Sequence, residues 1–127
     1  MAFDLACIVT GHREGRLAVP TLRSFQRAIE VAREHYSVQA LLYLDRPDAL
    51  TERLFKGFAE TPESLQIVDF GDQGQVRNAA IEKVEGTYTA FLDGDDLWSS
   101  DWLVQAMGFL QDKPDTYIAH PAFNYFF

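Results

Sequence analysis

The sequence has a single cysteine, no long hydrophobic run and an excess of acidic over basic residues. Cys7 is the only cysteine among 127 residues, so no disulfide can form within the chain. No apolar stretch reaches the roughly 18–20 residues that a membrane-spanning helix needs. The amino terminus also has no basic start followed by a cleavable apolar segment. These absences predict a protein of the reducing cytoplasm without a secretion signal.

The charge balance argues against nucleic acid and anionic membranes as partners. The 11 Lys and Arg residues are outnumbered by 19 Asp and Glu residues, which gives a formal net charge of −8. A small phosphorylated ligand remains compatible if a metal ion or local arginines reverse the field at its site. The apolar content of 47% and aromatic content of 13% are typical of a packed protein, and the length fits one domain over residues 1–127.

Short apolar runs alternate with amphipathic segments along the chain. The apolar runs are typical of buried strands and cover residues 3–10, 38–44, 65–70 and 87–92. Helical periodicity predicts helices over residues 20–36, 49–59 and 75–84, the last of these closed by Gly86, and a fourth after 99–101. Residues 116–127 are predicted to form an aromatic strand or extended tail. This alternation predicts an α/β fold, with a mostly parallel sheet flanked by helices on both faces.

An acidic turn, Asp93-Gly94-Asp95-Asp96, follows the fourth predicted strand. Gly94 allows the chain to turn, so that Asp93 and Asp95 can converge. Crowded carboxylates are hard oxygen ligands that suit Mg²⁺ or Mn²⁺. The alternative is a solvated acidic turn that caps the next helix.

Polar clusters follow all four predicted strands, at residues 10–14, 45–48, 72–78 and 93–96. Ligands of open α/β sheets bind outside the carboxyl ends of the strands. The four clusters are therefore expected to share one edge of the sheet and one site.

Arg77 is predicted to lie at the start of a helix, after two glycines. An arginine at a helix N-terminus can bind a phosphate oxygen or a base edge. The alternative is an arginine that pairs with Asp72 or Asp93 to balance their charge.

His12 and Asp45 each follow a predicted strand. The imidazole of His12 could stack on a flat ligand ring, and the carboxylate of Asp45 could accept a hydrogen bond from a base N–H. The alternatives are an exposed loop histidine and a turn residue before Pro47.

Four segments together resemble a family 2 glycosyltransferase of the GT-A fold. The specific part is the pattern G-x-x-x-R-N-A-A-I followed by G-x-Y-x-x-F-L-D-x-D-D, and the weaker parts are Val9-Thr10-Gly11-His12-Arg13-Glu14 and Leu44-Asp45. The resemblance implies a nucleotide-diphosphate sugar donor (a UDP- or GDP-sugar) and transfer of its sugar, with inversion, to an acceptor hydroxyl compound.

The resemblance also implies roles for residues of the first three clusters. Thr10 and His12 would line the base pocket. Asp45 would bind the base N–H, and Arg77 would lie near the base or a phosphate.

The acidic turn would complete the donor site. The turn at Gly94 would contact the donor, and Asp93 would bind ribose or, through water, the metal ion. Asp95 would be the direct ligand of Mg²⁺ or Mn²⁺, and Asp96 would support the turn.

The chain departs from the family pattern in three places. Arg13 replaces the usual Asn, and Asp45-Arg46-Pro47-Asp48 replaces an Asp-Asp-Gly-Ser stretch. Family members are also much longer, and their second half supplies the acceptor site and the catalytic base. The chain is therefore predicted to be a nucleotide-sugar-binding half. It is either excised from a longer enzyme or completed by another copy or a partner, with residues 118–127 as the segment that invites association. No base is assigned, although Asp112 and Asp115 lie near the corresponding end of the chain.

Two other functions remain open from the sequence. One is a non-catalytic module that binds a nucleotide sugar or only assembles. The other is a phosphotransferase or phosphatase with Asp93 as its nucleophile, because such enzymes also carry an Asp-x-Asp motif after an apolar strand.

Overall fold

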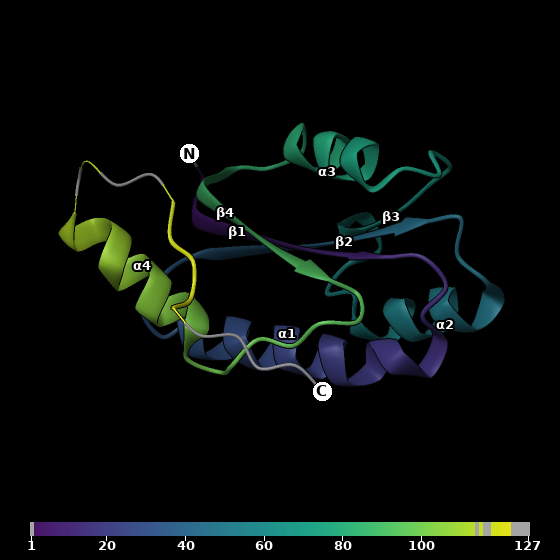
Figure 1. Ribbon diagram of the computed structural model, residues 1–127, viewed down its shortest axis with the longest axis horizontal. Coiled ribbons are helices and arrows are strands. Elements are labelled where there is room, and N and C mark those ends of the chain that lie inside the picture. The colour runs from purple at the N-terminus through teal and green to yellow at the C-terminus, as the bar shows by residue number, and fades with distance from the viewer. Residues whose placement is uncertain (1, 114, 116–117, 123–127) are drawn as a thin grey trace.

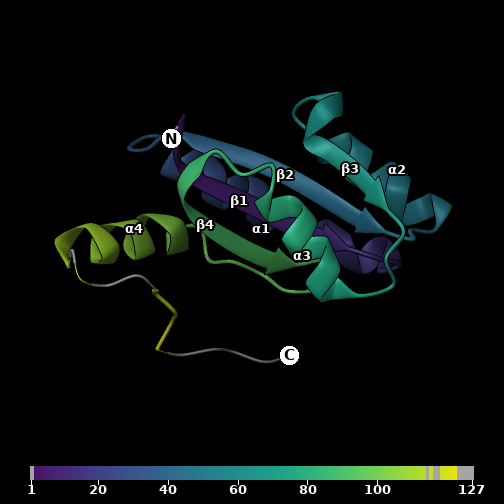
Figure 2. The same cartoon turned by 90° about the horizontal axis from the view of Figure 1, so that it is seen from above.

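The computed structural model describes residues 2–113, 115 and 118–122. Its centre is a four-stranded sheet in the order β3-β2-β1-β4, in which every neighbouring pair is parallel (Figure 2). The strands are β1 (Phe3–Gly11), β2 (Val38–Asp45), β3 (Leu65–Val68) and β4 (Gly86–Asp93). All four carboxyl ends therefore lie at one edge, as predicted.

Helices cover both faces of the sheet, as predicted. Figure 1 shows α3 on one face and α1, α2 and α4 on the other. The helices are α1 (Ala18–Ala32), α2 (Ala49–Phe58), α3 (Gln73–Ile81) and α4 (Trp102–Asp112), with 3₁₀ turns η1 (Gly15–Leu17) and η2 (Pro62–Ser64). Over the described ranges, no helix combines the length and hydropathy needed to cross a membrane.

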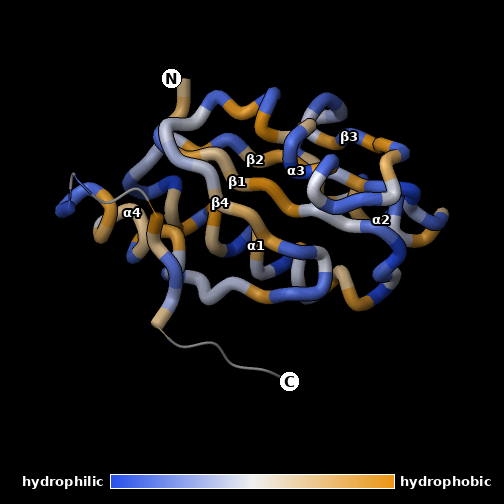
Figure 3. Tube along the Cα trace, turned by 45° about the horizontal axis from the view of Figure 1, so that its top comes forward, coloured by the Kyte–Doolittle hydropathy of each residue, from blue (hydrophilic) through white to orange (hydrophobic). Residues whose placement is uncertain are grey.

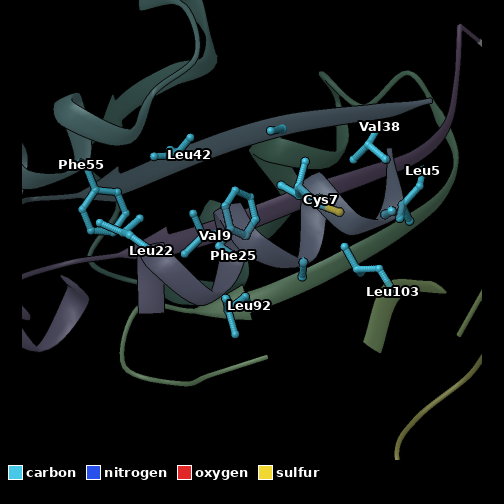
Figure 4. Close-up of a cluster of buried hydrophobic side chains, with 14 of the residues drawn as sticks. Leu5, Cys7, Val9, Leu22, Phe25, Val38, Leu42, Phe55, Leu92 and Leu103 are labelled. Atoms are coloured by element: carbon cyan, nitrogen blue, oxygen red, sulfur yellow. The ribbon is translucent and has the colours of Figure 1, made fainter. Parts of the chain in front are cut away.

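β1 is an interior strand, paired with β2 and β4, and its side chains alternate between two apolar layers. Leu5, Cys7 and Val9 face the larger layer under α1 and α4 (Figure 4). Ile8 faces the smaller layer, where it packs with Val76 of α3. The hydrophobic colouring of the middle strands in Figure 3 follows this arrangement. Burial raises the pKa of the Cys7 thiol strongly.

The predicted helix boundaries differ from the observed ones. α1 begins at Ala18 and ends at Ala32, after which His35 and Tyr36 turn back to donate to the Ala32 carbonyl. α3 begins at Gln73, because the Asp72 side chain caps it by accepting from the N–H of Gly74.

Gly86 was predicted to end α3, and that prediction is wrong. α3 ends at Ile81, and Gly86 is the first residue of β4, opposite Phe3. A Cβ at Gly86 would lie 2.5 Å from the backbone nitrogen of Ala6, so a side chain would prevent this close approach.

The third strand is shorter than predicted, since it leaves the sheet after Val68. Of the predicted aromatic strand over 116–127, residues 118–122 form no strand, and 116–117 and 123–127 lie outside the described residues.

Candidate functional site

A cleft of about 410 Å³ opens at the carboxyl edge of the sheet. Its walls come from the ends of β1, β2 and β4 and from the start of α3. The lining residues are Thr10, Gly11, His12, Glu14, Asp45, Gly71, Asp72, Gln73, Val76, Asp93, Gly94 and Asp95. The four polar clusters thus meet in one cavity, and of the predicted donor and metal residues Arg77 alone is absent from this lining.

Strand register explains why distant residues meet here. Thr10 of β1 lies directly opposite Asp93 of β4, and Gly11 lies opposite Leu44 of β2. The residues that follow, His12 and Asp45, are therefore neighbours, and the His12 Nδ1 lies within hydrogen-bond distance of the Asp45 carbonyl oxygen.

Asp93 is held by two donors from α3. Gln73 Nε2 donates to Asp93 Oδ1 at 2.7 Å, and Arg77 Nη2 donates to the same oxygen at 2.8 Å. The Arg77 guanidinium also lies over the Phe91 ring, 5.6 Å from its centroid. Arg77 thus adopts the charge-balancing arrangement that the sequence left open. It touches the cleft through Asp93.

Gly94 lets the acidic turn approach β1. A Cβ at Gly94 would lie 2.9 Å from the Thr10 carbonyl oxygen and 2.9 Å from a Glu14 carboxylate oxygen. The turn is closed by the Asp96 N–H, which donates to the Asp93 carbonyl at 3.0 Å, and it leaves Asp95 exposed at the cleft. Partial desolvation, together with repulsion from Asp95 and Asp93, raises the pKa of Asp96.

Asp45 lines the cleft and also binds the backbone of the loop that follows β3. It is 7% exposed, and its Oδ1 accepts from the Phe70 N–H at 2.8 Å. Burial raises the pKa of Asp45, but the backbone N–H groups of Phe70, Gly71 and Asp72, together with the positive charge of Arg46, outweigh burial and lower it overall. One oxygen of the predicted base acceptor is therefore already engaged by the β3–α3 loop.

For the predicted divalent metal ion, the acidic turn offers two carboxylates, Asp93 and Asp95, rather than a complete set of protein ligands. Over the part of the chain that the structure describes, no group of three or more His, Cys, Asp or Glu side chains is placed to hold a metal. Mg²⁺ commonly takes one or two protein carboxylates and fills its other positions with water and substrate phosphates. Asp95 and the second oxygen of Asp93 fit that mode of binding.

No role was predicted for Gln73 or Glu14, although both lie in the polar clusters at 72–78 and 10–14. Gln73 was placed in a loop because the helix was expected to begin two residues later, yet its amide also donates to Thr10 Oγ1 at 3.2 Å. Glu14 accepts from the His12 N–H at 2.6 Å and packs against the acidic turn. The one sequence signal for this contact was Gly94, because a glycine between acidic residues indicates that another group approaches the backbone closely.

Asp112 is excluded as the catalytic base of this cleft. It ends α4, and its neighbour Gln111 accepts from the Tyr36 hydroxyl at 3.2 Å, just before β2 begins. That contact lies at the amino edge of the sheet, away from the carboxyl ends of the strands (Figure 1). The base of this cleft therefore stays unassigned.

The chain matches the model of glycosyl transferase family 2 over residues 7–126. It belongs to that family. A segment of 37 residues is 43% identical to the Bacillus subtilis (strain 168) glycosyltransferase TuaG, which is named for teichuronic acid biosynthesis; it covers 29% of this chain and 15% of TuaG.

The fold of this family 2 chain is also that of S. aureus TarS. The crystal structure of TarS 1–349 superimposes with a TM-score of 0.67 over 86% of this chain and 32% of that chain, at 19% identity. A second TarS crystal structure gives the same TM-score over 20% of its chain. The likeness shows the GT-A fold, as predicted. The chain spans about a third or less of the relatives it matches.

Proposed function

We propose that this family 2 glycosyltransferase domain binds a UDP- or GDP-sugar in the cleft at the carboxyl edge of its sheet. The observation that carries the proposal is the meeting of the Asp93-Gly94-Asp95 turn with the ends of β1 and β2 and the start of α3 in one cavity of about 410 Å³. A cavity of this size at the carboxyl ends of parallel strands suits a nucleotide.

The charge of the lining supports a divalent cation as a further component. Five carboxylates line the cleft, from Glu14, Asp45, Asp72, Asp93 and Asp95. A diphosphate would be repelled by them without a compensating charge. Asp95 and Asp93 would hold Mg²⁺ or Mn²⁺, which would supply charge neutralisation of the departing diphosphate.

The chain's own residues prepare this site. Gln73 and Arg77 both donate to Asp93 Oδ1, which orients the carboxylate and leaves its second oxygen for ribose or the cation. Thr10 and His12 line the cleft on the β1 side and would contact the base and ribose.

The proposed reaction is transfer of the sugar with inversion. The acceptor hydroxyl attacks the anomeric carbon from the face opposite the diphosphate, the bond from that carbon to the diphosphate oxygen breaks, and a base takes the hydroxyl proton. Because the chain covers only part of TuaG and TarS, a non-catalytic donor-binding module is the second candidate. Family membership gives no support to the phosphotransferase alternative.

Calorimetric titration tests the proposal directly. UDP and GDP are titrated with and without Mn²⁺ into the wild type, Asp95→Ala and the exposed control Asp112→Ala. We expect Mn²⁺-dependent binding that is lost in Asp95→Ala and retained in Asp112→Ala. Binding of UDP or GDP that depends neither on Mn²⁺ nor on Asp95 would contradict the assignment of this cleft as the donor site. Turnover of a UDP-sugar then separates an enzyme from a binding module.

A further inference from the structure

The residue after Asp45 has an unusual backbone. Arg46 has a φ of 49°, and it is the one non-glycine residue with a positive φ in the described parts of the chain. This left-handed conformation is unfavourable for a residue with a Cβ, and such residues persist where surrounding contacts hold them. Its position, at the turn that leaves β2 beside the cleft, calls for a specific cause.

The Arg46 side chain turns back onto the β3–α3 loop. Its Nε pairs with the Asp69 carboxylate, and its backbone N–H donates to the Val68 carbonyl at 3.0 Å. The two charged side chains are 55% and 81% exposed, and an ion pair so exposed contributes little to stability. Fold stability alone therefore does not explain why a strained arginine is placed here.

The guanidinium also occupies the space beside Gly71. Gly71 has a φ of 67°, and a Cβ there would lie 2.9 Å from Arg46 Cζ. Gly71 is itself a wall of the cleft. The arginine therefore packs beside a loop segment that also lines the ligand cavity.

Asp45 also holds this loop. Its Oδ1 accepts from the Phe70 N–H at 2.8 Å, while Arg46 pairs with Asp69 and lies beside Gly71. Two consecutive residues thus contact neighbouring residues of one short segment. We propose that Asp45 and Arg46 form a clasp that fixes the loop 69–72 as a wall of the cleft, and that Arg46 is a positioning residue for nucleotide binding.

The clasp acts on the site through the start of α3. Loop 69–72 ends at Asp72, which caps α3, and the next residue, Gln73, donates to Asp93 Oδ1 at 2.7 Å. A loop that moves would carry Gln73 away from Asp93. The part of this inference that concerns nucleotide affinity rests on the proposed function, whereas the clasp itself does not.

Arg46→Gly is the sharpest test, because glycine accepts the positive φ while the guanidinium is lost. We expect an unchanged or higher Tm, but amide hydrogen exchange at Phe70, Gly71 and Asp72 that is about fivefold faster. We also expect a Kd for UDP with Mn²⁺ that is about fivefold weaker, which converts to about 1 kcal/mol. Asp69→Asn should reproduce the faster exchange and the weaker UDP binding. The double variant should differ little from Arg46→Gly alone.

Arg27→Ala is the matched control. Arg27 forms an exposed ion pair with Glu30 on α1, and neither residue lines the cleft. Unchanged exchange at residues 70–72 in Arg46→Gly would overturn the clasp. Faster exchange with unchanged UDP affinity would overturn its role in nucleotide binding. A wild type that binds no UDP would defeat the proposed function, while the exchange comparison would still decide the clasp.

Discussion

Arg77 Nη2 donates to Asp93 Oδ1 at 2.8 Å, linking α3 to the end of β4. The side chains are 41% and 37% exposed, so solvent screens the pair and its contribution to folding is small. The main effect of this ion pair is to fix the orientation of the Asp93 carboxylate in the cleft.

Replacing Arg77 should therefore damage binding more than folding. We expect Arg77→Ala to weaken UDP affinity in the presence of Mn²⁺ about fivefold to tenfold, or about 1–1.4 kcal/mol, just below the usual range for a charged hydrogen bond because the pair is partly exposed. Calorimetry measures the affinity and a thermal melt measures the stability. Arg23→Ala, at an exposed position on α1, should change neither. Equal losses in the two variants would contradict the role given to Asp93.

Gly94→Ala should destabilise the protein. The new Cβ would meet the Thr10 carbonyl oxygen at 2.9 Å, and a backbone atom in a β-sheet cannot easily move away. We expect a loss of about 1–3 kcal/mol in the free energy of unfolding, measured by urea denaturation.

Gly108→Ala supplies the matched control. It lies inside α4, and a Cβ there would meet nothing within 4 Å. Alanine should stabilise this helix by about 0.5–1 kcal/mol. If Gly94→Ala proved as harmless as Gly108→Ala, the acidic turn would not lie against β1 as described.

Asp96 should make the protein sensitive to pH and to divalent cations. Desolvation and the charges of Asp95 and Asp93 raise the pKa of Asp96 in the folded state. Folding therefore favours the protonated acid, and the ionised form opposes folding once the pH exceeds the folded-state pKa. Asp96→Asn should stabilise the protein at pH 7 without metal by about 0.5 kcal/mol or less, since the side chain is exposed.

Urea denaturation at two pH values checks this effect. The advantage of Asp96→Asn should shrink as the pH falls below the folded-state pKa of Asp96, because the wild-type carboxyl is then neutral. Added Mn²⁺ should also reduce it, since a cation offsets the repulsion. An advantage that persists at low pH would point to a cause other than charge.

The Cys7 thiol should be inert in the folded protein. It is 0% exposed in the interior strand β1, and burial raises its pKa so that little thiolate forms. Reaction with a thiol reagent such as DTNB should be negligible in buffer and complete in denaturant. Rapid labelling of native protein would show that β1 opens without global unfolding.

Much of the architecture follows from local patterns. The strands follow from short continuous apolar runs that the chain itself carries. The apolar stripe of α1, with Leu22, Phe25 and Ile29 buried, follows from steps of three to four residues. Once strand and helix alternate, right-handed crossovers bring the carboxyl ends of the strands to one edge. The convergence of the cleft residues was predictable for that reason.

Individual contacts at the site were not predictable in the same way. Arg77 could have faced a ligand or an acidic neighbour, and only its position relative to Asp93 decided between them. Asp45 accepts a hydrogen bond from Phe70, 25 residues away, because β3 ends early and its loop folds back. No local pattern encodes a backbone N–H turning toward a distant carboxylate.

By itself, the sequence determined the α/β class, the family 2 resemblance and the placement of an acidic turn at the fourth strand's end, because each depends on residue types at short spacings. Only the tertiary structure decided that Gly86 begins a strand, that Asp112 lies at the far edge and that Asp45 and Arg46 grip a loop. Those outcomes depend on close approach between segments distant in sequence, where steric fit and hydrogen-bond geometry select the partner.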